Sequence, residues 1–351
     1  MTVGSIGRTW SEGDIPGQSG QAAVVTGANA GIGFQIARVL AQCGADVVLA
    51  CRDTSKAEQA ADRIRAELDS AEPGHPQPGR PGNGRGSVAV VRLDLASLAS
   101  VREAAECIRS GYPHLALLIN NAGVMEVPYA RTQDGFELTF ATNHLGHFAL
   151  TGLLLDQLLA TPDSRIVTMS SQAHIGGSMN FDDLQGERGY DPEAAYAQSK
   201  LANLLFAYEL DRRLRAAGSS TISLAAHPGV VLTSLFGNRS RLNRLLLSPR
   251  LRPLNFRRVQ NVRMGALPAL RAATDPAAVG GEFYGPRLRY DTGYPDRVSS
   301  IPRSHDAADQ TRLWQASEHL TGVSYPLAAR YSGDHDRSGP LGTGRWGDAV
   351  S

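Results

Sequence analysis

Short apolar runs alternate with longer amphipathic stretches between residue 22 and about residue 226. The runs are rich in Val, Ile and Leu and contain few polar residues, which is typical of strands buried on both faces of a parallel sheet. They predict six strands, at residues 22–26, 46–50, 87–93, 115–119, 165–170 and 221–226.

The stretches between these runs predict helices, because their apolar residues recur every three or four positions. Gly44 and Gly218 stand at the ends of two of them, where a left-handed residue commonly ends a helix. The alternation predicts an α/β fold, a Rossmann-type doubly wound parallel sheet flanked by helices in a single domain. The helices are expected at 32–44, 54–71, 98–110, 134–160 and 192–217.

Four segments depart from this rhythm. Residues 73–86 hold nine Gly or Pro in fourteen positions, which predicts a loop inserted into the domain. We expect a flexible N-terminal segment at 1–19, a domain at 20–323 and a disordered tail at 324–351. A substrate lid is expected at 234–263, where 238–263 carries eight arginines and no acid. That stretch fits either a cationic surface for a membrane or acidic substrate, or a solvated Arg-rich helix pair.

Composition excludes several classes of protein. With 35 basic and 34 acidic side chains the formal charge is +1, which argues against a general nucleic-acid or polyanion binder. The three cysteines, Cys43, Cys51 and Cys107, are too far apart for a disulfide framework or a metal knuckle. We find no apolar run of membrane-spanning length and no secretory signal in the first twenty residues, so a cytoplasmic protein is expected.

A glycine-rich turn follows the first predicted strand. It reads Thr26-Gly27-Ala28-Asn29-Ala30-Gly31-Ile32-Gly33 and leads into a predicted helix. Glycines permit a sharp turn and a close approach to a pyrophosphate, and a helix N-terminus offers N–H groups to phosphates. The turn therefore predicts a dinucleotide site.

The end of the second predicted strand bears on the choice of dinucleotide. An acid there usually binds the ribose of NAD, whereas an arginine suits the 2′-phosphate of NADP. Cys51 stands where the acid is expected and Arg52 follows, which favours NADP over NAD. The nearby Asp53 leaves a solvated Arg–Asp pair as the alternative.

Taken together, the motifs resemble the short-chain dehydrogenase/reductase family over about residues 20–290. Beyond the glycine turn, the resemblance rests on Asn120-Asn121-Ala122-Gly123, Asn143, Ser171, Tyr196-x-x-x-Lys200 and His227-Pro228-Gly229. The segments ACRD, LINNAGVM, NHLGHFALT and YAQSKLANLLF are similar to the retinol-dehydrogenase-like branch.

The resemblance implies roles for individual residues. Tyr196, Lys200, Ser171 and Asn143 would form the catalytic set, with the Asn143 carbonyl holding a water that relays protons to Lys200. Asp94 would contact the adenine, and Pro228-Gly229 the nicotinamide, with Thr233 nearby. The cofactor-binding set expected in total is Gly27, Asn29, Gly31, Ile32, Gly33, Arg52, Asp94, Leu95, Asn121, Ala122, Gly123, Tyr196, Lys200, Pro228, Gly229 and Thr233.

Tyr196 and Lys200 are also a plausible pair on physical grounds. Four positions apart on a helix, they project from one face. An ammonium about 4 Å from a phenolate stabilises it by about 4 kcal/mol at an effective dielectric near 20, an upper figure of about three pKa units. Such a pair is common on surfaces, but only Lys56 and Lys200 are lysines here. Arginine could not replace Lys200 because its pKa is too high to pass a proton.

Ser171 ends a predicted strand and would donate to the substrate oxygen as charge develops there. Ser170 is the alternative, since 25 residues separate Ser171 from Tyr196 where the family usually has thirteen. His144, His147 and His174 lie near these residues, but nothing supplies a converging ligand set. We expect them to pack and form local hydrogen bonds, and we expect no metal.

These residues predict an NADP-dependent enzyme that transfers a hydride between nicotinamide and a carbonyl or alcohol, with a small, lipophilic substrate. The alternatives are a reductase of a conjugated C=C bond and a non-catalytic NADP-binding sensor or scaffold. Apolar residues surround most of the predicted helices 134–160 and 192–217. One face of each suffices for the core, so the surplus favours a homodimer or homotetramer.

Overall fold

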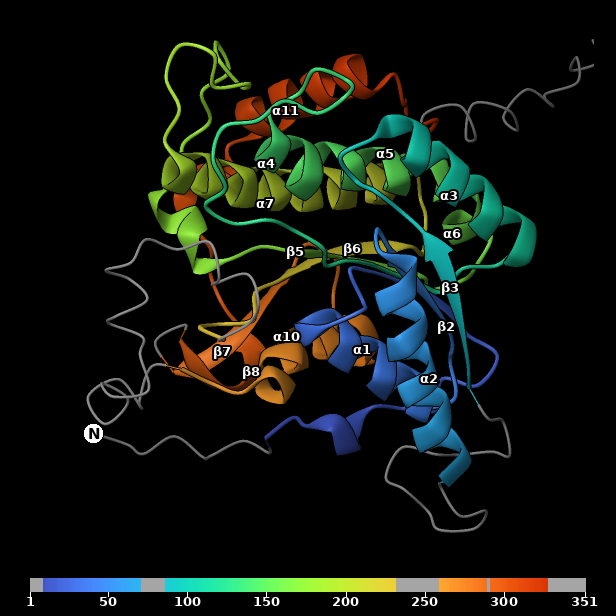
Figure 1. Ribbon diagram of the computed structural model, residues 1–351. Coiled ribbons are helices and arrows are strands. Elements are labelled where there is room, and N and C mark those ends of the chain that lie inside the picture. The colour runs from blue at the N-terminus through green and yellow to red at the C-terminus, as the bar shows by residue number, and fades with distance from the viewer. Residues whose placement is uncertain (1–8, 71–85, 232–258, 289–290, 328–351) are drawn as a thin grey trace, which may run out of the picture.

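The chain forms one eight-stranded sheet covered by helices on both faces (Figure 1). The computed structural model describes residues 9–70, 86–231, 259–288 and 291–327. The strand order is β3-β2-β1-β4-β5-β6-β7-β8; every neighbouring pair is parallel except β7 and β8, which are antiparallel. The strands are β1 (Ala22–Thr26), β2 (Asp46–Cys51), β3 (Ser87–Arg92), β4 (Leu117–Asn120), β5 (Arg165–Met169), β6 (Ile222–Ala226), β7 (Phe283–Leu288) and β8 (Thr292–Arg297).

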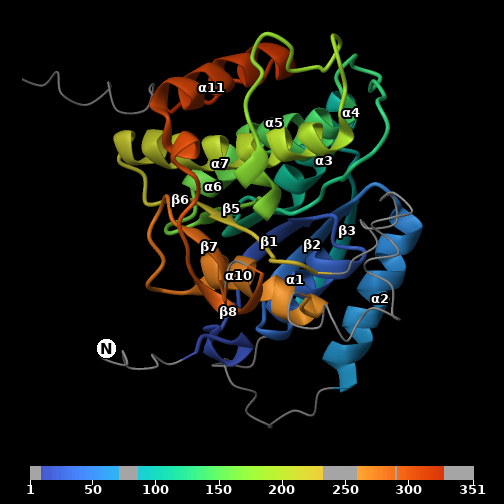
Figure 2. The ribbon, with the colours of Figure 1, turned by 90° about the vertical axis from the view of Figure 1, so that its left-hand side faces the viewer.

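Two apolar cores separate the sheet from its helices. One joins the sheet to α1 (Gly31–Gln42), α2 (Thr54–Ser70) and α10 (Val262–Thr274). The other lies under α3 (Leu98–Gly111), α5 (Gly146–Leu153), α6 (Leu155–Leu159) and α7 (Pro192–Ala216), with α11 (Ala307–Thr321) outside them (Figure 2). The other helices within the described residues are short: η1 (Glu12–Asp14), α4 (Leu138–Phe140), the π-helix η2 (Ala141–Leu145), η3 (Gln172–Gly176) and η5 (Pro302–His305).

The predicted α/β fold is confirmed, because all six predicted strands and four of the five predicted helices occur within a few residues of their expected bounds. Gly44 and Gly218 have φ angles of 101° and 66°, the left-handed conformation expected after a helix. No helix in the described ranges combines the length and apolar character needed to cross a bilayer.

The prediction of one continuous helix at 134–160 is wrong. Helical structure begins at Leu138, because the Glu137 side chain accepts hydrogen bonds from the N–H groups of Thr139 and Phe140. The turn that follows is a π-helix, in which the Gly146 N–H bonds to the Ala141 carbonyl five residues earlier. A second break at Leu154 separates α5 from α6.

The packed domain also extends beyond both of its predicted ends, residues 20 and 323. Trp10 and Ile15 are buried in the core beside α1, so the described part of the predicted flexible segment 1–19 is packed. Tyr325 and Leu327 are likewise buried at the start of the predicted tail 324–351. Single apolar side chains in polar stretches anchor both ends, and periodicity does not detect them.

Two predicted features fall mostly outside the described residues: the insertion 73–86, of which Gly86 is described, and the lid 234–263. At the C-terminal end of the lid, Gln260 pairs with Val231 in a parallel bridge, and α10 begins at Val262.

The surplus of apolar residues on α7 has an explanation within the chain. Residues 199–211 are buried around the whole helix, because the sheet lies on one side and α11 on the other (Figure 2). Trp314 of α11 packs against the rings of Phe148, Phe206 and Tyr325. The burial of α7 within its own chain therefore removes the observation on which the predicted homodimer or homotetramer rested.

Candidate active site

The predicted site residues gather at the carboxyl ends of the parallel strands, where sheets of this kind bind ligands. Thr26 ends β1, Cys51 ends β2, and Asn120 ends β4. Ser171 and His227 follow β5 and β6 within two residues. The topology therefore brings together motifs that are up to about 200 positions apart in the sequence.

The glycine turn forms a tight cradle between β1 and α1. A Cβ on Gly33 would lie 2.5 Å from both the Gly27 carbonyl oxygen and Asn121 Nδ2, so only glycine fits. Gly31 begins α1, and no acid stands in the first turn of this helix. The helix N-terminus, with Asn29 and Ile32 beside it, is thus suited to an anion such as a pyrophosphate.

Thr26 ties this cradle to the loop after β4. Its hydroxyl oxygen accepts hydrogen bonds from the N–H groups of Asn121 and Ala122, both at 2.9 Å. The Asn121 side chain donates in return to the Thr26 carbonyl at 2.8 Å. A single hydroxyl therefore holds two predicted cofactor-binding segments together, a role that the motif alone did not reveal.

Three consecutive residues at the end of β2, Cys51, Arg52 and Asp53, have different environments. Cys51 is buried against the backbone of residues 27–29, and burial raises the pKa of its thiol to about 11, so the thiol carries no charge. Asp53 accepts hydrogen bonds from the Lys56 backbone N–H and forms an ion pair with its ammonium at 2.9 Å, which lowers the Asp53 pKa. Arg52 is exposed and forms no ion pair with any described residue.

The other predicted cofactor contacts differ in accessibility. Asp94 is half-buried, and one of its carboxylate oxygens accepts from the Ala96 N–H, whereas Leu95 is buried against α5. Gly229 has a φ of 68°, and a Cβ there would lie 2.3 Å from the Asp291 carbonyl oxygen. Thr233 lies outside the described residues.

Gln260 supports the Pro228–Gly229 segment through hydrogen bonds. Its side chain donates to the Pro228 carbonyl at 2.5 Å and accepts from the Gly293 N–H at 3.0 Å. Gln260 was not predicted as a site residue, because it lies about thirty positions beyond the motif that it supports.

Asn143 is buried in the π-helix, and its amide group is fully occupied. Its oxygen accepts from the Val124 N–H at 2.8 Å, while its nitrogen donates to the Val124 carbonyl and to Ser199 Oγ, both at 2.9 Å. Ser199 in turn donates to the Tyr196 carbonyl at 2.7 Å. The side chain thus clamps the loop after β4 to the first half of α7.

The Lys200 side chain extends from α7 toward Asn143 and the loop after β4. Its ammonium donates to the Met169 carbonyl at 3.2 Å and lies 5.7 Å from the centre of the Tyr196 ring. A Cβ on Gly123 would be 3.5 Å from Lys200 Nζ and 3.0 Å from Asn143 Oδ1, so the three residues share one small space. Lys200 is 5% exposed, and burial lowers its pKa to about 8.

The two candidate serines have different surroundings. Ser170 is buried, and its hydroxyl donates to the Lys200 carbonyl at 2.8 Å, which uses its only proton. Ser171 Oγ accepts from the Ala173 N–H at 3.3 Å, so its proton is available to another acceptor. Because Ser170 and Met169 both bond to Lys200, the strand end places Ser171 beside the Tyr–Lys pair.

The histidines near the site make local contacts. His144 contacts Ser317, and His174 contacts the Ser171 carbonyl, as expected for packing and local hydrogen bonds. His147 contacts both Thr26 and Asn143. In the described part of the chain, no three His, Cys, Asp or Glu side chains converge as metal ligands.

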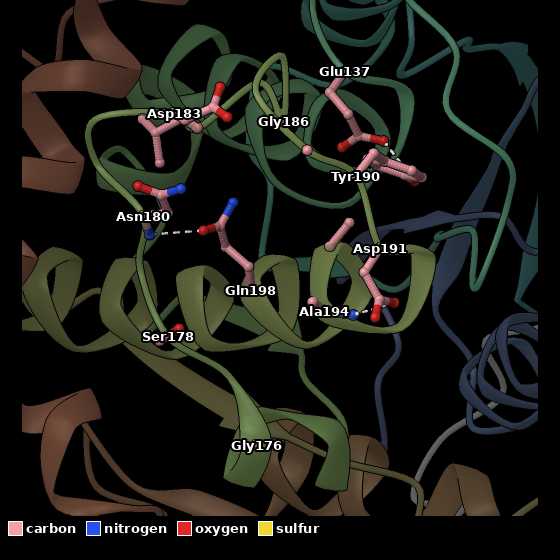
Figure 3. Close-up of a pocket in the computed structure, with 13 residues that line it drawn as sticks. Glu137, Gly176, Ser178, Asn180, Asp183, Gly186, Tyr190, Asp191, Ala194 and Gln198 are labelled. Carbon is pink, nitrogen blue, oxygen red and sulfur yellow. Dashed lines mark hydrogen bonds between the residues drawn. The ribbon is translucent and has the colours of Figure 1, made fainter.

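A separate cavity of about 230 Å³ lies between the loop that ends at Asp191 and the start of α7 (Figure 3). Glu137, Asp183 and Asp191 line it, but each accepts hydrogen bonds from backbone N–H groups. Tyr196 and Lys200 are not among its lining residues. The structural role of these three acids is therefore to cap loops and helix N-termini.

Comparison with known proteins agrees with this geometry. Human retinol dehydrogenase 14 is 39% identical over 306 residues, which is 87% of this chain and 87% of that protein. Human retinol dehydrogenase 13 is 40% identical over 319 residues, covering 90% and 88%.

Solved structures give the same result. An uncharacterized protein from Mycobacterium paratuberculosis is 40% identical, with a TM-score of 0.71, and the match covers 91% of this chain and all of that one. A structure from Beutenbergia cavernae, described as an NAD(P)-dependent gluconate 5-dehydrogenase with bound NADP at low occupancy, is 26% identical. Its TM-score is 0.57, and the match covers 76% of this chain and 94% of that one.

The profile of the short chain dehydrogenase family matches residues 21–243. With these identities and this fold, the chain belongs to the short-chain dehydrogenase/reductase family, in its retinol-dehydrogenase-like branch.

Proposed function

We propose that this protein uses NADP to interconvert a lipophilic carbonyl compound and its alcohol, with Tyr196, Lys200, Ser171 and Asn143 as the catalytic set. Its family and relatives make it an oxidoreductase that acts on CH–OH or C=O groups. The observation that carries the finer proposal is the buried ammonium of Lys200, 5.7 Å from the Tyr196 ring.

The residues present fit a dinucleotide. The cradle between Gly27 and Gly33 has no room for a side chain, and α1 begins there. Cys51 is neutral, and Arg52 forms no ion pair with the described residues, which suits a 2′-phosphate better than a ribose hydroxyl pair. The acid that could bind the ribose, Asp53, is paired with Lys56. When bound, NADPH would supply the hydride.

The chain's own groups would handle the proton and the developing charge. The positive charge of Lys200 favours the phenolate form of Tyr196, which assists proton exchange between this tyrosine and the substrate oxygen. Ser171 donates its available proton to the substrate oxygen. Asn143 aligns α7 through Ser199 and offers its carbonyl to the proton path that ends at Lys200.

The lipophilic substrate class is supported by two observations. Curated relatives at about 40% identity are named retinol dehydrogenases. Ile175 lies in η3, four residues after Ser171, and is 56% exposed, so an apolar side chain is available close in sequence to the candidate serine.

The test is NADPH oxidation with a panel of aldehydes and ketones that includes all-trans-retinal. Tyr196→Phe should lower kcat by at least about 100-fold while NADPH binding stays within about threefold, because only proton transfer is lost. Tyr208→Phe is the matched control, since this tyrosine of α7 is buried against Ser300, outside the catalytic set, and should leave kcat unchanged.

Equal rates for wild type and Tyr196→Phe would contradict the tyrosine mechanism. Tight NADPH binding without turnover of any probe would favour a sensor or scaffold, and a saturated carbonyl product would favour a C=C reductase.

Cofactor preference is tested with Arg52→Ala. Loss of a charge-assisted phosphate contact should weaken NADPH binding by about 10- to 100-fold and leave NADH binding nearly unchanged. Arg109→Ala on α3 is the control, because Arg109 pairs with Glu106 at the far end of that helix. An unchanged NADPH affinity in Arg52→Ala would contradict the assignment.

A further inference from the structure

His147 contacts two parts of the candidate site that belong to different sequence motifs, Thr26 and Asn143. It lies in the first turn of α5, is 1% exposed, and comes four residues after Asn143. One ring nitrogen, Nδ1, is 3.0 Å from the Asn143 carbonyl oxygen. The other, Nε2, is 2.9 Å from Thr26 Oγ1, below the glycine cradle.

These two contacts determine where the imidazole proton resides. A carbonyl oxygen can only accept, so Nδ1 must carry the hydrogen and donate to Asn143. Nε2 is then an acceptor, and the Thr26 hydroxyl donates to it. Thr26 Oγ1 already accepts from the N–H groups of Asn121 and Ala122, so its proton is free to point at His147.

The ring is also held neutral. The His147 pKa is lowered to about 4, mainly by burial; the bond to the Asn143 carbonyl opposes this lowering, and the positive charge of Lys200 adds to it. The ring therefore keeps one tautomer across the working pH range, and it lies within the field of the catalytic lysine.

The Asn143 carbonyl needs such support, because its backbone turns through a π-helix there rather than a regular α-helix. The side-chain amide of Asn143 is hydrogen-bonded to Val124 and Ser199, and these bonds fix the side chain. The direction of the backbone carbonyl must be fixed by other contacts. His147 supplies one of these contacts from the same helix.

We propose that His147 is a positioning residue: its Nδ1–H orients the Asn143 carbonyl toward the proton path to Lys200, and its contact with Thr26 fixes the tautomer that can donate this bond. This inference rests on the proposed function, because it assigns His147 to the proton path of that reaction.

Two substitutions separate the two contacts. In His147→Asn the side-chain amide nitrogen stands where Nδ1 was, so it can still donate to Asn143 but cannot reach Thr26. In His147→Gln the amide group stands where Nε2 was, so it can accept from Thr26 but does not donate to Asn143. The Thr26 hydroxyl has a second acceptor in either case, the Ile119 carbonyl at 3.4 Å.

The readouts are kcat with saturating NADPH and retinal, its solvent deuterium isotope effect, and the NADPH dissociation constant from cofactor fluorescence. We expect His147→Gln to lower kcat by about 10- to 100-fold and to enlarge the isotope effect, with NADPH affinity within about threefold. His147→Asn should keep kcat within about threefold. His114→Gln, at an exposed histidine before β4, is the control.

Equal kcat losses in the Asn and Gln variants, with an unchanged isotope effect, would overturn the proposal and leave a packing role. A second measurement does not depend on activity. Nitrogen-15 NMR of the imidazole should show the neutral Nδ1–H tautomer between about pH 6 and pH 9, and an Nε2–H tautomer or an imidazolium would overturn the proposal. If wild type turns over no probe, the proposed function and the proton-path role fail together, while the NMR result still decides the hydrogen bonds.

Discussion

The ammonium group of Lys200 is buried, and burial disfavours its charged form. Lys200 is 5% exposed, and in the described structure its ammonium has the Met169 carbonyl as a hydrogen-bond acceptor but no acidic ion-pair partner. Burial lowers its pKa from 10.5 to about 8, so below pH 8 the folded protein holds a poorly solvated cation. The fold therefore gives up stability to keep an ammonium beside Tyr196.

Lys200→Met should stabilise the protein while abolishing turnover. A base whose folded pKa is lowered costs stability below that pKa, and the cost disappears as pH rises to the unfolded value. The difference between 10.5 and about 8 corresponds to about 3 kcal/mol at pH 7 and to less than about 1 kcal/mol at pH 10. Asn203 still donates to the Met169 carbonyl in the variant.

Urea denaturation of wild type and variant at these two pH values measures the effect. Lys56→Met is the control, since that lysine is on the surface and should show no such pH-dependent gain. A Lys200→Met protein that is less stable than wild type at pH 7 would show that the ammonium is better solvated than its burial indicates.

At the scale of single residues, the sequence identifies the candidate catalytic residues but not the side chains that support them. Lys200 stands out because only two lysines occur in the chain. Thr26 and His147 do not, because their contact joins positions 121 apart and depends on side-chain direction. Likewise, the ion pair between Asp53 and Lys56 is visible only in the structure.

Among the elements, the segment between Glu137 and Leu159 differs most from the expected structure. Its composition favours one helix, yet the side chains of Glu137 and Asn143 bond to the backbone and change its path. A propensity argument sums over a window and misses such single contacts. The strands were easier to predict, because burial on both faces leaves a continuous apolar run.

Gly146 sets how closely α5 approaches the end of β3. A Cβ there would lie 2.4 Å from the Leu95 carbonyl oxygen, which is backbone and cannot move aside cheaply. Gly146→Ala should therefore destabilise the fold by about 1–3 kcal/mol. Because Asn143 and His147 flank it, kcat should fall as well.

Gly111→Ala provides the matched control, since Gly111 is the last residue of α3 and an added Cβ meets nothing within 4 Å. It should be neutral or stabilising by up to about 1 kcal/mol. Urea denaturation of both variants gives the comparison, and equal effects would mean that α5 can shift to admit the methyl group.

At the scale of the whole molecule, the predicted order of strands and helices led to the correct architecture up to β6. The chain beyond it adds β7, β8, α10 and α11, which were not predicted. Their positions are set by tertiary contacts, such as that of Arg213 with the Trp314 ring at 4.3 Å. Such contacts are invisible to local patterns.

The covering of α7 by α11 leads to a prediction about assembly. A helix whose residues 199–211 are buried within its own chain has no apolar face to offer a second copy. We expect light scattering to give a mass near 37.4 kDa, independent of concentration between roughly 1 and 100 µM. Hydrogen exchange of the α7 and α11 peptides should likewise not depend on concentration. A dimer in which these peptides gain protection would show that α11 moves aside, whereas a dimer without that change would use another surface.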